Sequence, residues 1–141
     1  MDREAIYSAL FAKLRTAAVF QTASRRLKHW SDVSPADQPA LFQSQRRETA
    51  NTLPGLNTIW ELRVDVYLYA RAPDQENPPA QILNPLLDAL AATLAPDPIT
   101  NKQRLGGLVE HVWIEGEIET DEGVLGDQGV CIVPLVLKVS S

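Results

Sequence analysis

Hydrophobic and polar residues alternate most regularly in the C-terminal third of the chain, from Gln103 to Val139. Over Leu108 to Glu119 one parity is mainly apolar and the other mainly polar, which is typical of a half-buried strand. A glycine-bearing turn over residues 120–129 follows, and Val130 to Val139 is then apolar on both parities. The region predicts a β-hairpin of two long strands, the second of which needs cover on both faces.

A third long strand is predicted from Ile59 to Arg71, where Trp60, Leu62 and Val64 begin an apolar face. Thirteen extended residues would span about 43 Å. A compact chain of this length has a diameter of only about 37 Å. The strand must therefore bend, fray or project, and projection would indicate assembly. A strand kinked by a bulge within a monomer is the alternative.

Two segments carry apolar residues at helical spacing, the first from Arg3 to about Ala18 and the second from about Pro79 to Leu94. Weaker patterns predict short strands over Arg25 to Trp30 and Ala40 to Glu48, and neither face of the latter is clearly a core face. The expected order is α-β-β-β-α-β-β. This order predicts one α+β domain over residues 1–141, with two helices packed on one face of a mostly antiparallel mixed sheet.

Composition narrows the function classes. Thirteen Lys and Arg against eighteen Asp and Glu give a net charge of -5, which disfavours sequence-specific binding to nucleic acid. The single cysteine, Cys131, lies within a predicted strand, so we expect a small core residue and a reducing compartment. No apolar run approaches the roughly 20 residues that span a bilayer. We therefore expect a soluble, intracellular protein with no membrane partner.

Candidate chemistry is sparse, because the chain has no phosphate-binding glycine loop, no Cys-x-x-Cys and no Gly-x-Ser-x-Gly. One arrangement stands out: His111 with Glu115, Glu117 and Glu119, which a continuous strand would point the same way. Such oxygen ligands would suit Mg²⁺ or Mn²⁺. A solvated strand face beside Trp113 explains the same pattern more simply. We expect no cofactor, no metal and no catalytic residue, and therefore not an enzyme.

Five segments together resemble a known family. They are the strand Ile59–Tyr69, the helical Leu83–Leu90, the Leu-Gly-Gly and Trp-x-Glu-Gly motifs within Gln103–Gly116, the short Val133–Leu135 and the stretch Ser34–Phe42. In this combination the chain resembles the tail-terminator and minor tail proteins of long, non-contractile-tailed bacteriophages. The resemblance covers most of the chain, and its motifs are structural rather than catalytic.

The resemblance implies a structural virion protein that caps the tail tube as a hexameric ring, terminates tail elongation and offers the surface for head attachment. A prophage-encoded homologue would have the same properties. The implied partners are further copies of the chain, the tail-tube protein and a head-completion protein. The implied location is the host cytoplasm during assembly and then the head-proximal end of the virion tail. Another neck component, of the head-closure or connector type, is the main alternative, and a metal-dependent enzyme built on His111 and the glutamates is a less favoured one.

The two sets of surface residues that follow come from charge and predicted exposure, and no family motif assigns them. The residues expected at contacts between subunits or with the tube are Arg25, Arg26, Lys28, Arg71, Asp74 and Glu76. The basic run from Arg25 to Lys28 could also contact phosphate, but a solvated strand edge protected by positive charge is the commoner explanation of such a run. The residues expected to face the central channel, where like charges would repel DNA, are Glu115, Glu117, Glu119, Asp121 and Glu122.

Overall fold

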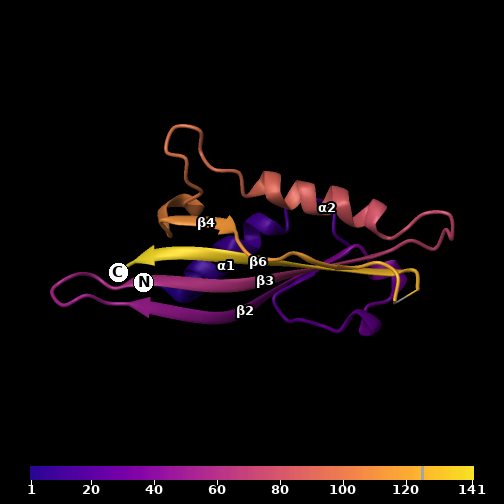
Figure 1. Cartoon of the computed structure of the whole chain (residues 1–141), viewed down its shortest axis with the longest axis horizontal. Coiled ribbons are helices and arrows are strands. Elements are labelled where there is room, and N and C mark those ends of the chain that lie inside the picture. Colours follow the sequence, from indigo (N-terminus) through magenta and orange to yellow (C-terminus); the bar gives the residue numbers. More distant parts are fainter. Residues whose placement is uncertain (125) are drawn as a thin grey trace.

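The computed structural model describes residues 1–124 and 126–141. Within them, the sheet has the strand order β1-β2-β3-β6-β4, and β5 also pairs with β6 (Figure 1). The β1–β2 pair is parallel and the other pairs are antiparallel. The elements are α1 (Arg3–Leu14), β1 (Thr22–Ser24), β2 (Ala40–Asn51), β3 (Ile59–Arg71), α2 (Ala80–Thr93), β4 (His111–Ile114), β5 (Glu119–Asp121) and β6 (Gln128–Ser140).

The predicted α+β class and the mostly antiparallel mixed sheet are confirmed, and both helices contribute to one core on one side of the sheet, here called the inner face. Asp2 caps α1 by accepting a hydrogen bond from the Ala5 N–H at 3.0 Å. The apolar parity of β3 lies on the inner face, as its alternation predicts. The fully buried side chains of this core include Ile6, Leu10, Leu14, Leu41, Leu62, Val64, Val66, Leu68, Leu83, Leu90, Val133, Leu135 and Leu137.

The opposite side of the sheet, here called the outer face, carries a second and smaller cluster. The Phe42 and Tyr69 rings lie with their centroids 5.4 Å apart, and Val33 and Trp30 from the preceding segment pack over them. Val130 of β6 packs against the same cluster. The start of β6 is therefore covered on both faces, as its apolar pattern predicts.

Raising the pH above about 10 should destabilise the protein through Tyr69, whose hydroxyl donates to the Lys28 carbonyl oxygen at 2.6 Å. Burial, and to a lesser extent Tyr67, raise the pKa of Tyr69 to about 12. The unfolded chain, with tyrosines ionising near pH 10, therefore loses this proton first. The contribution of Tyr69 to the free energy of unfolding should be fully present below about pH 10. It should fall by about 1–2 kcal/mol as the pH rises to about 12.

Urea unfolding at a series of pH values measures this fall, and Tyr69→Phe should make it shallower. A residual fall should remain in the variant, because burial and a hydrogen bond to Glu48 also raise the pKa of Tyr7. Equal pH dependence in the variant and the parent protein would contradict the assignment.

The predicted continuous strand from Leu108 to Glu119 is wrong, because it is broken into β4 and β5. Four residues, 115–118, lie opposite only two residues of β6 between the pairs Ile114–Leu135 and Glu119–Ile132. Pro134 explains the break: its carbonyl accepts from the Glu115 N–H at 3.1 Å, so the side of β6 that faces this edge lacks a donor at Pro134. Gly116 then takes a φ of +113° directly against the Pro134 ring.

Two N-terminal predictions are also corrected. The strand predicted over Arg25 to Trp30 is instead the three residues Thr22–Ser24, which pair with Ala40–Phe42 of β2. The Arg25 side chain, directly after this strand, forms an ion pair with Glu4 of α1. The first helix ends at Leu14 rather than near Ala18, where the Thr16 hydroxyl donates to the Lys13 carbonyl and the chain tightens into a turn. Neither change alters the number of strands; the described residues have one strand more than predicted because β4 and β5 replace a single predicted strand.

The long strands both kink and project. β2 has 12 residues, and β3 and β6 have 13 each. A bulge between Gln45 and Glu48 interrupts the β2–β3 register. Beyond it, the β2–β3 hairpin extends past the helices to form one end of the molecule (Figure 1). Both outcomes considered for an over-long strand thus occur in this one hairpin.

Candidate assembly interface

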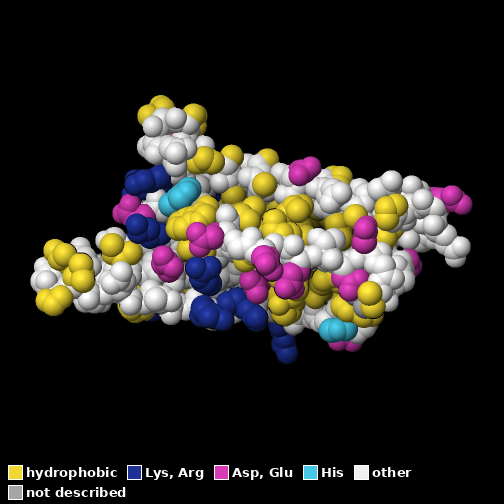
Figure 2. All heavy atoms as spheres, viewed as in Figure 1, with side chains coloured by type: hydrophobic (Ala, Val, Ile, Leu, Met, Phe, Trp, Pro, Cys, Tyr) yellow, Lys and Arg dark blue, Asp and Glu magenta, His cyan; other side chains and the backbone are white. Residues whose placement is uncertain are grey.

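The tip of the projecting hairpin exposes a group of apolar side chains. Leu53 and Leu56 are 60% and 66% exposed, and Ile59 is 38% exposed. They border a surface hollow of about 440 Å³, and Figure 2 shows apolar side chains gathered at this end of the molecule. The residues that line the tip hollow are Asn51, Leu53, Gly55, Leu56, Asn57, Ile59 and Ser140, none of which is charged.

Sequence reasoning assigned no role to this tip. A usable signal was nonetheless present, because the eleven residues from Thr49 to Ile59 contain no charged side chain. Surface loops that remain in water usually carry charge, and exposed apolar clusters often mark contacts with other proteins. The tip is therefore the first candidate for an assembly contact.

The opposite end of the molecule is acidic, and two loops that were assigned to different surfaces meet there. The loop expected at subunit contacts and the turn expected at the channel line one hollow of about 690 Å³. Arg71 pairs with Asp127 at 2.6 Å, and the Ala72 N–H donates to the Asp127 carbonyl. The carboxylates that line this hollow, here called the acidic end, are Asp74, Glu76, Glu122 and Asp127.

Two of these carboxylates organise the acidic end itself. Asp74 accepts hydrogen bonds from the Glu76 N–H and the Asn77 side chain, at 2.9 and 2.7 Å. Glu122 accepts from the Ala80 N–H at the start of α2, at 3.3 Å. A carboxylate at a helix N-terminus interacts favourably with the helix dipole. Asp74 and Glu122 thus have structural contacts within the subunit, and Glu76 is exposed.

The basic segment that was expected at subunit contacts divides into different environments. Arg25 forms an ion pair with Glu4 and donates to the Gln45 side chain at 3.2 Å. Hydrogen bonds from Arg25 and Ser8 hold the pKa of Glu4 below its usual value. Arg26 and Lys28 are exposed, and the Lys28 carbonyl accepts from Tyr69. Arg25 therefore links the segment to α1, whereas Arg26 and Lys28 are available for contacts.

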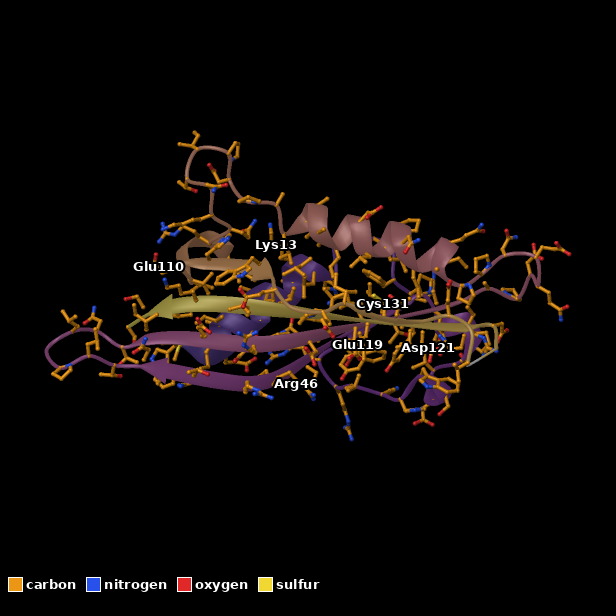
Figure 3. All side chains as sticks on the ribbon, viewed as in Figure 1. Lys13, Arg46, Glu110, Glu119, Asp121 and Cys131 are labelled. Carbon is orange, nitrogen blue, oxygen red and sulfur yellow. The ribbon has the colours of Figure 1, made fainter. Side chains whose placement is uncertain are left out.

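The glutamates expected at the channel do not form one continuous row. Glu119 and Asp121 pair with Ile132 and Val130 in the register, so they lie on the outer face; Figure 3 labels both side chains. Glu115 accepts from Arg63 at 3.3 Å and from the Trp113 indole at 3.4 Å. Glu117 lies in the break between β4 and β5 and is exposed.

Three arginines gather at the bulge in β2, two from β2 and one from the outer face of β3. Arg46 and Arg47 both lie opposite Arg63, because Gln45 and Glu48 pair with the residues on either side of it. Acidic partners surround the group: Arg46 pairs with Asp65 at 3.0 Å, and Arg63 contacts Glu61 and Glu115. The cluster largely neutralises itself, which weakens the case for a phosphate-binding surface.

The proposed row of metal ligands is not assembled. The Nδ1 atom of His111 accepts from the Gln103 N–H at 2.9 Å, and its ring stacks on Trp113 with centroids 5.0 Å apart. The strand ends at Ile114, and Glu115 turns to Arg63. Over residues 1–124 and 126–141, no group of three His, Cys, Asp or Glu side chains is arranged to hold a metal ion.

Comparison with known proteins adds no family assignment: no family model matches the chain, and a search of curated proteins finds no similar sequence. In the part of the chain that the structure describes, no helix combines the length and the apolar character needed to cross a bilayer.

Proposed function

We propose that this chain is a structural protein of a long-tailed bacteriophage that caps the tail tube as a ring, terminates tail elongation and offers a surface for head attachment. It would act in the host cytoplasm during assembly and remain at the head-proximal end of the tail. Its partners would be further copies of itself, the tail-tube protein and a head-completion protein.

The observation that carries the proposal is the projection of the β2–β3 hairpin with an uncharged, apolar tip. An isolated hairpin end gains nothing from exposing two leucines to water, whereas a neighbouring subunit would bury them. A role in assembly accounts for this feature directly. The resemblance carried by the Leu-Gly-Gly and Trp-x-Glu-Gly segments supports the kind of assembly proposed, a ring on the phage tail tube.

Charge also supports the proposal. The net charge of -5 and the carboxylates on the outer face and at the acidic end suit a ring through which DNA slides without binding. The self-neutralised arginine cluster agrees with this reading, because it leaves little positive charge for phosphates.

The test is the mass of the purified protein over a concentration series, by light scattering behind a sizing column, with and without the tail-tube protein. We expect hexamers, in free solution or on the tube end. Weak association of the free protein would agree with the proposal, because added contacts on the tube shift the equilibrium by mass action. Tubes grown with the protein present should be capped and shorter by electron microscopy.

A protein that stays monomeric at every concentration and leaves tube growth unchanged would contradict the proposal. Binding to a portal-side protein instead of the tube would favour the head-closure or connector alternative.

A further inference from the structure

We infer that the far half of β2, from Glu48 to Asn51, is a hinged segment that a polar clasp from α1 holds against β3. The clasp consists of Arg3, Tyr7 and Glu48, and the hinge is the bulge in β2. When the clasp is broken, the far half of β2 and the hairpin tip swing away from the sheet together.

The far half of β2 has a neighbouring strand on one side only. β1 pairs with β2 over Ala40–Phe42, so β3 is the one described strand beside Glu48–Asn51 (Figure 1). The bulge interrupts even this pairing, because two residues of β2 lie opposite one residue of β3 there. The side chains from Gln45 to Asn51 are exposed. A one-sided, interrupted pair of strands in water opens more easily than the rest of a sheet.

β3 stays in place when the far half of β2 opens. Its residues Ile59–Leu62 also pair with Leu137–Ser140 of β6. The Ser141 N–H donates to the Thr58 carbonyl at 3.0 Å, and the Trp60 indole donates to the Ser141 hydroxyl at 3.2 Å. The hinge therefore lies in β2 alone.

Glu48 is the centre of the clasp. It lies opposite Leu62 in the register, so it is on the inner face with α1. The Tyr7 hydroxyl and the Arg3 Nε each donate to its carboxylate at 2.9 Å. The Arg3 guanidinium also lies 4.9 Å from the centroid of the Trp60 ring. Because Tyr7 is 1% exposed and belongs to the main core, these charge-assisted hydrogen bonds join the far half of β2 to a fixed part of the molecule.

The near half of β2 is held by separate contacts. Gln43 is buried and donates to the Tyr7 carbonyl at 3.0 Å. Gln45, the last paired residue before the bulge, accepts from Arg25 at 3.2 Å. Loss of the Glu48 carboxylate leaves both of these hydrogen bonds in place. Motion is therefore expected beyond the bulge only, which distinguishes a hinge from a general loosening of α1.

The clasp sets the direction in which the tip projects. The far half of β2 leads directly into the tip, which exposes Leu53 and Leu56. A tip held in one direction loses less conformational entropy in an assembly contact than a tip that swings. This consequence rests on the proposed function, whereas the hinge and the clasp do not.

Distances between two spin labels, measured by electron paramagnetic resonance, test the hinge in the full chain. The labels are attached at Leu53→Cys on the tip and at Asp88→Cys on α2, both exposed positions, while the native Cys131 is buried. The labelled parent protein should give one narrow distance distribution. Glu48→Ala should widen this distribution at least about twofold, because the tip then swings about the bulge.

Hydrogen exchange of the unlabelled variants identifies the strand that opens. In Glu48→Ala, the protected amide protons from Glu48 to Asn51 should exchange at least about tenfold faster than in the parent protein. Those of β6 should change only as much as global stability requires. Tyr7→Phe removes one hydrogen bond of the clasp and keeps the ring in the core, so it should give a smaller effect in the same direction.

Glu61→Ala is the matched control. Glu61 lies opposite Thr49, in the same half of the hairpin, but it is on the outer face and contacts Arg63 rather than α1. It should leave the distance distribution and the exchange rates unchanged.

Three results would overturn the hinge. They are a parent-like distance distribution in Glu48→Ala, equal widening in Glu61→Ala, and uniform acceleration of exchange over the whole chain. All of these measurements use the free protein. The hinge can therefore fail while the proposed ring stands, and the ring can fail while the hinge stands.

Discussion

Gly129→Val is expected to unfold the protein or reduce its stability by several kcal/mol, and Gly129→Ala should cost about 1–3 kcal/mol. A Cβ at Gly129 would lie 2.7 Å from the Pro79 Cβ and 2.9 Å from the Leu83 Cδ1. Leu83 can adjust, but Pro79 is a rigid ring at the start of α2. The start of the helix would therefore have to move away from β6.

An opposing effect is smaller than this clash. Replacing glycine by alanine restricts the unfolded chain and can stabilise a protein by about 0.4–1 kcal/mol where the folded backbone accepts the change. Gly123→Ala is the matched control, because no atom lies within 4 Å of its added Cβ. Urea unfolding of both variants should show a loss only at Gly129. Equal tolerance at the two glycines would mean that α2 does not pack closely on β6.

Much of the fold follows from local pattern. The faces of β3 could be predicted because its inward positions are apolar over the whole strand, and both helices pack on that face. α2 could be predicted because proline marks its start and leucines recur along one stripe. In these elements the local pattern and the tertiary contacts agree, so a single sequence is sufficient.

The errors lie where a distant residue decides the outcome. The alternation from Leu108 to Glu119 continues through the break in the sequence. Pro134 on the partner strand, however, has no backbone N–H for the hydrogen bond that a continuous pair of strands would need there. Likewise β1 has only three residues, and its parallel pairing with β2 selects Thr22–Ser24 over the basic residues that follow. Neither partner can be identified from the local pattern of the segment itself.

The candidate interface was predictable in composition but not in position. The absence of charge from Thr49 to Ile59 is visible in the sequence, yet an uncharged loop folded back over the core has the same composition. Only the projection of the hairpin exposes Leu53 and Leu56. The meeting of Asp74 with Glu122 at the acidic end depends on α2 starting beside the turn that precedes β6, which no local signal encodes.

The second large effect is expected at a buried amide pair. Gln38 and Gln128 each donate to the other's side-chain oxygen at 2.9 Å, and both are buried. Gln38 also donates to the Val33 carbonyl at 3.1 Å, and Gln128 donates to the Gly129 carbonyl at 2.8 Å. The pair thus fastens the segment that covers the outer face to the start of β6.

Gln128→Leu should destabilise the protein by about 2–4 kcal/mol, because it leaves the Gln38 amide buried without two of its three side-chain hydrogen bonds. Gln38→Leu should have a similar cost for the same reason. The double variant removes both amides, so its cost should be smaller than the sum of the two single costs by about 1–3 kcal/mol. Denaturant unfolding of the four proteins gives this coupling, and additive losses would show that the amides do not depend on each other.

Hydrogen exchange locates the effect within the fold. In Gln128→Leu, amide protons from Trp30 to Gln38 should exchange faster than in the parent protein, because this segment loses its attachment to β6. The amide protons of α1 should change only as much as global stability requires, since α1 packs on the inner face. Uniform acceleration over the whole chain would mean that the pair stabilises the fold without fastening the cover of the outer face. Selective acceleration would show that the second cluster, around Phe42 and Tyr69, opens separately from the main core.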